Sequence, residues 1–120
     1  MENKMEEKEL LIAKKFSNMY YYAYGLFDKY PKAERFGLVA DMKNSLNTAL
    51  RYIFYAQKVQ SKLKLDYLNK IDAELLYLRF AVRLSHSKKY ITNDNYVHFS
   101  SLIAEIGKML GGWIKSCPKE

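Results

Sequence analysis

The chain has 120 residues and a formal net charge of +7, from 20 lysines and arginines against 13 aspartates and glutamates; the length predicts a single domain over residues 1–120. The basic balance predicts a partner that carries phosphates, either a nucleic acid or an anionic membrane. One cysteine, Cys117, excludes an internal disulfide and a thiolate metal site and is typical of a reducing compartment.

Residues 1–9 carry charges of both signs, which is unlike a signal peptide. No stretch of the sequence reaches the roughly 18 uninterrupted apolar residues of a membrane span. We therefore expect a cytoplasmic protein that has no membrane partner.

From the first helix onward, apolar residues recur at spacings of three and four, which places them on one face of a helix and not of a strand. We expect the first helix over 6–29, because acidic residues suit its first turns and Pro31 forces the preceding residue out of the helical region. The first apolar stripe consists of Ile12, Phe16, Met19, Ala23, Leu26 and Tyr30.

A second helix is expected over 34–61 and a third over 66–86. The connection between them, 61–65, contains no glycine or proline, and Asp66 is the candidate N-cap of the third helix. The stripes are Val39, Met42, Leu46, Ala49 and Ile53 in the second helix and Leu68, Ile71, Leu75, Leu78 and Val82 in the third, where the next position, Ser85, is polar.

Residues 87–91 are mostly polar and aperiodic, so we expect a loop there, followed by a fourth helix over 93–115 with Thr92 as its N-cap. Four long amphipathic helices with short connections predict an all-α fold, an antiparallel up-down-up-down four-helix bundle. The fourth stripe consists of Tyr96, Phe99, Ile103, Ile106, Leu110 and Trp113.

The chain has 11 tyrosines and 6 phenylalanines, more than one bundle core can enclose. The tyrosines of the first helix point in different directions, so some must lie on a second surface, against another subunit or a flat ligand. Gly107 and Gly111 lie four residues apart and leave a groove for a neighbouring helix; the alternative is that the helix frays from Gly111 onward. We assign a subunit interface to Tyr20, Tyr21, Tyr24, Gly107, Gly111 and Trp113.

The excess positive charge lies mainly on the second and third helices and in the loop that follows. At about 100° per residue, the basic residues of the second helix fall within about one quarter of its circumference, and Arg79, Arg83 and His86 share a face of the third. Because sequential helices pack as antiparallel neighbours, we expect the two stripes to merge into one basic surface. The amides and aromatics that interleave with the first stripe are Asn44, Asn47, Tyr52, Tyr55 and Gln57.

Such a surface suits phosphates, sugars and unpaired bases, and binding through it would weaken steeply with salt. The alternative is that both stripes are only the solvated faces of two helices. The residues that we expect to contact nucleic acid are Lys43, Arg51, Lys58, Lys62, Arg79, Arg83, Lys88 and Lys89.

Candidates for catalysis are weak. Arg79 and His86 have the spacing of the ribonuclease motif of HEPN domains, but Phe80 stands where that motif usually has a polar residue. His98 has no metal-ligand partner three or four residues away, and Cys117 has no adjacent histidine to activate it. The sequence has no glycine-rich phosphate loop. We therefore expect no catalytic residues, no metal and no cofactor, with a ribonuclease as the remote alternative.

Two motifs resemble a known family. Residues 30–38, Tyr-Pro-Lys-Ala-Glu-Arg-Phe-Gly-Leu, resemble the F-P-K-x-E-R-F-G-L signature of four-helix-bundle proteins encoded in intervening sequences of ribosomal RNA genes. Residues 105–116, Glu-Ile-Gly-Lys-Met-Leu-Gly-Gly-Trp-Ile-Lys-Ser, resemble the accessory variability determinant (Avd) branch of that family. Residues 45–51 lack the Pro and Gly of the ribosomal branch, which favours the Avd-like branch.

The resemblance implies a four-helix bundle that forms homopentameric rings and has no known catalytic activity. It also implies RNA or DNA binding with little sequence preference, and association with the reverse transcriptase of a diversity-generating retroelement. The alternative is a protein-interaction bundle of the ribosomal intervening-sequence family, whose positive charge serves solubility or docking on an acidic protein.

Overall fold

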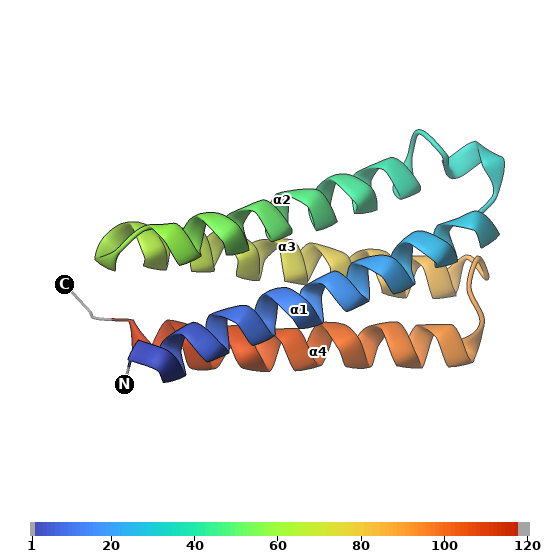
Figure 1. The fold of residues 1–120 in the computed structure, drawn as a ribbon. Coiled ribbons are helices and arrows are strands. Elements are labelled where there is room, and N and C mark those ends of the chain that lie inside the picture. The colour runs from blue at the N-terminus through green and yellow to red at the C-terminus, as the bar shows by residue number, and fades with distance from the viewer. Residues whose placement is uncertain (1, 118–120) are drawn as a thin grey trace.

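The computed structural model describes residues 2–117, and within that range it contains four α-helices, two short 3-10 helices and no strand. The helices run in alternating directions along a common axis (Figure 1), which confirms the predicted all-α, antiparallel up-down-up-down four-helix bundle. The elements are α1 (Glu2–Leu26), η1 (Phe27–Lys29), η2 (Lys32–Glu34), α2 (Leu38–Lys58), α3 (Ser61–Ser87) and α4 (Asn93–Ser116).

Each helix packs against two others. α1 and α3 both contact α2 and α4, and the most extensive contact joins α2 and α3. The bundle is elongated, measuring 46 × 24 × 19 Å. The connections α1–α2 and α3–α4 lie together at the right of Figure 1, which we call the loop end; the α2–α3 turn lies at the opposite, turn end.

The predicted apolar stripes form the core. All of their residues are buried except Tyr96, which is half-buried. Ser85, the polar interruption of the third stripe, is fully buried too. Its hydroxyl donates to the carbonyl O of Ala81 (2.8 Å) and accepts from the hydroxyl of Tyr30 (2.6 Å). Because a buried hydroxyl is costly only without partners, this pair lets the loop end close over the core.

The first two helices differ from their expected bounds. α1 begins at Glu2 rather than near residue 6, and its expected last turn tightens into η1. α2 begins at Leu38 rather than 34, because the residues after Pro31 form η2 and a turn. The carboxylate of Glu34 then accepts the N–H of Leu38 (3.1 Å) and satisfies one of the free donors at the start of α2.

The third helix begins at Ser61, so the prediction of a start at 66 with Asp66 as its cap is wrong. Val59 and Gln60 are both extended, and these two residues alone reverse the chain between α2 and α3. The lysines and leucines of 62–65 are good helix formers, so the helix starts one turn earlier than the cap signal indicates.

The fourth helix matches its expected bounds closely. The hydroxyl of Thr92 accepts the N–H of Asn95 (3.1 Å), which confirms the predicted N-cap. The helix continues through Gly111 to Ser116, so the alternative of fraying from Gly111 is wrong.

The Tyr30–Ser85 hydrogen bond gives a test of the loop end. Tyr30→Phe should lower the free energy of unfolding by about 1 kcal/mol, because the hydroxyl of Ser85 loses its buried donor. Chemical denaturation measures this, with Tyr21→Phe as the control, since Tyr21 is 78% exposed. The Tyr30→Phe and Ser85→Ala effects should not add; equal losses in Tyr30→Phe and Tyr21→Phe would contradict the assignment.

Candidate nucleic-acid interface

One side of α2 faces α1. The ammonium of Lys43 lies 4.5 Å from the ring centroid of Tyr24, and the amide of Gln57 donates to the carbonyl O of Glu9 (2.9 Å). The hydroxyl of Tyr20 donates to the side-chain oxygen of Asn47 in the same interhelical space. At about 100° per residue, Arg51 and Lys58 lie within about 80° of Lys43 around α2. Arg51 and Lys58 are exposed and turn from the α1 side toward solvent; together with Lys43 they form the group that we call the α1–α2 flank.

The other side of α2 faces α3. The hydroxyl of Ser45 donates to the carboxylate of Glu74 (2.7 Å), and the rings of Tyr52 and Tyr67 pack with centroids 5.6 Å apart. The buried residues beside them are small, among them Ala49, which lets the two helices approach closely. None of the basic residues predicted on α2 lies on this side.

The predicted basic residues of α3 face α4. The guanidinium of Arg79 lies over Gly107 of α4, where a Cβ would stand 4.0 Å from its Nη2. The ring of His86 stacks on Tyr96 of α4 with a centroid distance of 4.3 Å and an interplanar angle of 8°. Arg83 follows Arg79 by one turn. These residues belong to the α3–α4 flank.

The structure does not show the expected merger at Lys43 and Arg79, which lie against different helices, α1 and α4. α2 and α3 turn small and aromatic residues toward each other, and this rotation carries Lys43 toward α1 and Arg79 toward α4. For the exposed Arg51, Lys58 and Arg83, a joint basic surface stays a prediction. Lys62 lies at the turn end.

The outer surface between the flanks does not favour a polyanion. Asp41, Ser45, Glu74 and Tyr77 line a polar hollow of about 240 Å³ there. Burial raises the pKa of the Tyr77 phenol, and the carboxylates of Asp41 and Glu74 raise it further. The carboxylates of Asp41 and Glu74 thus lie at the surface between α2 and α3.

Nearer the turn end, the same surface carries three tyrosines, Tyr52, Tyr55 and Tyr67, with ring centroids 5.5–6.4 Å apart. The ammonium of Lys70 lies 5.6 Å from the ring centroids of Tyr52 and Tyr67. The amides and aromatics that we expected among the cations are thus divided. Asn47 and Gln57 serve the α1 contact, whereas these rings serve the α3 contact.

The predicted cations form no close ion pair among the side chains that the structure describes. Seven of them are exposed and Lys43 is half-buried. Among the side chains of residues 7–60 and 62–117, carboxylates lie within 4.0 Å of Lys15 and Lys64 only, and neither lysine belongs to the predicted set.

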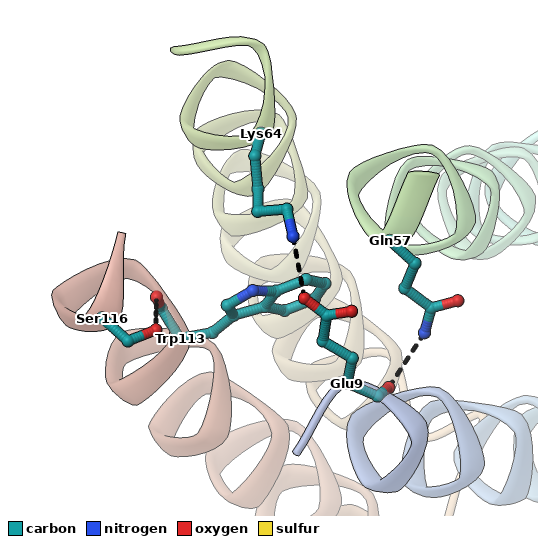
Figure 2. A network of polar contacts seen from close by, with 5 residues as sticks. All are labelled: Glu9, Gln57, Lys64, Trp113 and Ser116. Carbon is teal, nitrogen blue, oxygen red and sulfur yellow. Dashed lines mark hydrogen bonds and ion pairs between the residues drawn. The ribbon is translucent and has the colours of Figure 1, made fainter. Parts of the chain in front are cut away.

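Lys64, unlike the predicted cations, is engaged in contacts between the helices of the bundle (Figure 2). It reaches from α3 to the carboxylate of Glu9 on α1 (2.9 Å), and its ammonium lies 5.9 Å from the ring centroid of Trp113 on α4. With Gln57 bound to the backbone of Glu9, this network joins the four helices at the turn end. Lys64 therefore stabilises the bundle and does not add to the basic surface.

The signature motif builds the loop end. One carboxylate oxygen of Glu34 accepts the N–H of Leu38, and the other accepts the hydroxyl of Tyr90 (2.9 Å) from the α3–α4 loop. Gly37 makes this fold-back possible, because a Cβ there would stand 2.8 Å from the Glu34 carboxylate. Arg35 and Phe36, between these positions, point outward, and Phe36 is 88% exposed.

Further cations gather at this end. Lys32 and Arg35 line a hollow with Lys43, the first cation of the α1–α2 flank. Lys88 lies close enough to Glu34 to lower the pKa of its carboxyl, after the larger effects of the Leu38 and Tyr90 hydrogen bonds. Sequence reasoning placed Lys88 in the site but omitted Lys32 and Arg35. Their signal was the run of basic residues that begins before α2, outside any helical stripe.

Lys89 occupies a conformation that usually belongs to glycine. Its φ is 61°, and among the described residues it is the only one with a positive φ. The N–H of Tyr90 reaches the carbonyl O of Ser85 and that of Lys89 reaches His86, both at 2.9 Å, which completes a Schellman end to α3. Glycine would fit better here, so the strained position holds a lysine at a cost in stability, which points to a role for its charge.

The predicted interface residues fall into two groups. Tyr21 and Tyr24 are 78% and 52% exposed on α1, whereas Gly107 lies on the α3 side of α4, and a Cβ added at Gly111 would meet no neighbouring atom within 4 Å. A ring requires two different surfaces that meet between neighbouring copies, and the assignment of these residues to such surfaces stays a prediction. Trp113 does not fit the assignment, because it is 2% exposed and packs in the core of its own chain.

The candidate catalytic groups are engaged in packing. His86 is stacked on Tyr96, and His98 packs edge-on against Tyr22 with a centroid distance of 4.7 Å. Burial raises the pKa of the Cys117 thiol, which disfavours the reactive thiolate. Within residues 2–117, no three His, Cys, Asp or Glu residues gather as a metal site, and no helix is long and apolar enough to span a membrane.

A family model described as bAvd-like matches residues 10–117, nearly the whole chain. The chain belongs to the bAvd-like family. This confirms the resemblance to the Avd branch. Figure 1 and the contacts above show how the bAvd-like chain uses both family motifs: the first builds the loop end, and the second forms the last turns of α4.

The fold of this bAvd-like chain is also found in a solved structure. A protein of unknown function from the S23 ribosomal protein family, from Bacteroides thetaiotaomicron, is similar with a TM-score of 0.80 and 20% sequence identity. The alignment covers 91% of this chain and 99% of that one. At this identity the likeness shows a shared four-helix fold. A search of curated protein sequences found no match.

Lys89→Gly tests the strained end of α3. The substitution should raise the free energy of unfolding by about 1 kcal/mol, because glycine adopts a positive φ without the steric cost that Lys89 bears. Thermal or chemical unfolding measures this, with Lys88→Gly as the control, since Lys88 has φ −82° and should be destabilised. Equal destabilisation by both substitutions would contradict the assignment.

The pKa of Glu34 predicts an acid sensitivity of the loop end. Because the folded state lowers this pKa, the carboxylate contributes stability above its unfolded pKa, and that contribution is lost as the pH falls through the folded pKa. Melting temperatures at about pH 6 and about pH 3 should therefore differ less in Glu34→Gln than in the wild type. The exposed Asp66→Asn is the control; identical pH dependence of Glu34→Gln and the wild type would contradict the role of Glu34.

Proposed function

We propose that this bAvd-like chain is a non-enzymatic accessory protein that binds RNA or DNA through the α1–α2 flank and the loop end. The observation that carries the proposal is the row formed by Lys43, Arg51 and Lys58, none of which lies within 4.0 Å of a carboxylate among the side chains that the structure describes, 7–60 and 62–117. At 1.5 Å per residue the row spans about 22 Å along α2, and Lys32 and Arg35 extend it at the loop end.

The chemistry of this row suits phosphates more than bases. Lysine and arginine side chains on a helix surface contact backbone oxygens, which position a nucleic acid without reading its sequence. Two of the three amides beside the row already have partners, since Asn47 binds Tyr20 and Gln57 binds Glu9. We therefore expect binding with little sequence preference and a strong dependence on salt.

Family membership supports the rest of the proposal. The resemblance to accessory variability determinant proteins implies a homopentameric ring that works with the reverse transcriptase of a diversity-generating retroelement. The separate placement of the exposed tyrosines on α1 and the glycines on α4 agrees with a ring, in which unlike surfaces meet. Light scattering on the purified chain measures the subunit number directly, and a monomer at micromolar concentration would contradict the ring.

Binding of a labelled single-stranded RNA at several salt concentrations tests the surface. Replacing Lys43, Arg51 and Lys58 together with glutamine should weaken binding about tenfold or more and reduce the slope of log K against log salt by about one per lost phosphate contact. The matched control replaces Arg79, Arg83 and Lys108 with glutamine, which removes the same charge from the α3–α4 flank.

Two results would contradict the proposed surface. Equal losses in both triple variants would mean that only net charge matters, and a larger loss in the control would move the site to the α3–α4 flank. Absence of binding at low salt, or binding indifferent to salt, would contradict nucleic-acid binding itself.

A second candidate is a protein-docking bundle. The 88% exposure of Phe36 favours it, because an apolar ring between Arg35 and the start of α2 suits a pocket on an acidic partner. A pull-down of the reverse transcriptase that survives nuclease treatment, in a chain that fails to bind free RNA, would support this candidate. RNA that is cleaved by the wild type and left intact by His86→Ala would instead support the ribonuclease.

A further inference from the structure

A hollow of about 260 Å³ lies at the loop end, where α1 passes through η1 and η2 into α2. It is formed by residues of all these elements, including three aromatic rings, three cations and one carboxylate, that of Asp28. No residue of the row that runs on toward the turn end, Arg51 or Lys58, takes part. The hollow is therefore a distinct feature at one end of the basic flank.

Its three cations come from separate segments. Lys32 belongs to η2, Arg35 follows η2, and Lys43 lies on the second turn of α2. Lys43 is held in place, because its ammonium lies 4.5 Å from the ring centroid of Tyr24 and 5.9 Å from that of Phe27. None of the three pairs with a carboxylate among the described residues. Glu34, the carboxylate nearest in sequence to Lys32 and Arg35, uses both oxygens to bind Leu38 and Tyr90.

Apart from the exposed Asp28, whose carboxylate offsets one of the three positive charges, the remaining wall is apolar. Phe27 and Val39 are buried, and Tyr30, whose hydroxyl is engaged by Ser85, presents its ring. Tyr24 and Pro31 stand at the exposed margin. The volume lies just under the roughly 300 Å³ at which pockets for drug-sized molecules begin. A ligand of one nucleotide unit fits this size, with a doubly charged phosphate for the cations and a sugar or base for the apolar wall.

We propose that this hollow binds the 5′-phosphate of a nucleotide, through Lys32, Arg35 and Lys43. A terminal phosphomonoester carries close to two negative charges at neutral pH, whereas an internal phosphodiester carries one, so three unpaired cations discriminate between them. The arrangement deepens the proposed function and rests on it: the flank holds the body of a strand, and the hollow holds its 5′ end. A free mononucleotide has the same chemistry and is the other source of such a phosphate.

The test compares two oligonucleotides of one sequence, one with a 5′-phosphate and one with a 5′-hydroxyl, by fluorescence anisotropy with a 3′ label. The wild type should bind the phosphorylated strand about tenfold more tightly, as one added charge-assisted contact implies. Lys32→Gln combined with Arg35→Gln should abolish this ratio. Arg79→Gln combined with Arg83→Gln, which removes the same charge from the α3–α4 flank, should retain it.

Titration calorimetry with adenosine 5′-monophosphate, adenosine and inorganic phosphate identifies the ligand. Tighter binding of the monophosphate than of adenosine or inorganic phosphate supports the nucleotide site. If the two strands then bind equally, the ligand of this site is a free nucleotide. Inorganic phosphate that binds as well as the monophosphate overturns the inference, since the hollow would then be an anion site only. Equal binding of the two strands with no binding of the monophosphate also overturns it but leaves the proposed function intact, whereas failure of both strands to bind overturns the proposed function.

Discussion

The close packing of α2 against α3 is the constraint on which the surface of this protein depends. Ser45 and Ala49 turn toward α3, Glu74 accepts the hydroxyl of Ser45, and Tyr52 packs on Tyr67. A helix has only one rotation that satisfies such contacts, so every other side chain on α2 and α3 is placed by them. The same contacts that bury the core therefore send Lys43 of α2 toward α1 and Arg79 of α3 toward α4.

Some residues of the signature motif hold the loop end together, and others are exposed at its surface. Tyr30, Glu34 and Gly37 fix the loop end, because the first binds Ser85, the second caps α2 and binds Tyr90, and the third leaves room for that carboxylate. Lys32 and Arg35 make no such contact and present their charges to solvent. Because Tyr30, Glu34 and Gly37 fix the backbone of the motif, Lys32 and Arg35 start from defined positions, which recognition of a phosphate requires.

The fold was predictable because the burial pattern is regular. The three-and-four spacing identifies the core face of each helix without knowledge of its neighbours, and the cap at Thr92 is a local signal. The start of α3 was not predictable in this way. Asp66 has the residue type of an N-cap, whereas the actual turn, Val59 and Gln60, contains neither glycine nor proline. Trp113 was assigned to a subunit surface although its place in the fourth stripe already indicated the core that it occupies.

The site was predictable only in part, for a physical reason. Periodicity shows that Lys43 and Arg51 share a face of α2, and that Arg79 and Arg83 share a face of α3. It does not show on which side the neighbouring helix lies, because that depends on small residues and tyrosines whose pairing across the α2–α3 contact is a tertiary property. Lys32 and Arg35 lie outside the four α-helices, where no periodic pattern applies. The left-handed backbone of Lys89 has no signal in the sequence, because lysine normally avoids this conformation.

Backbone amide chemical shifts, followed by NMR while the labelled protein is titrated with single-stranded RNA, test the central claim that the two flanks differ. The account predicts that the largest shifts occur at 32–43, at Arg51 and Lys58, and at Lys88 and Lys89, with little change at Arg79, Arg83 and Gly107. Shifts of equal size on the α3–α4 flank, or shifts confined to it, would show that RNA does not distinguish the flanks as the packing of α2 on α3 requires.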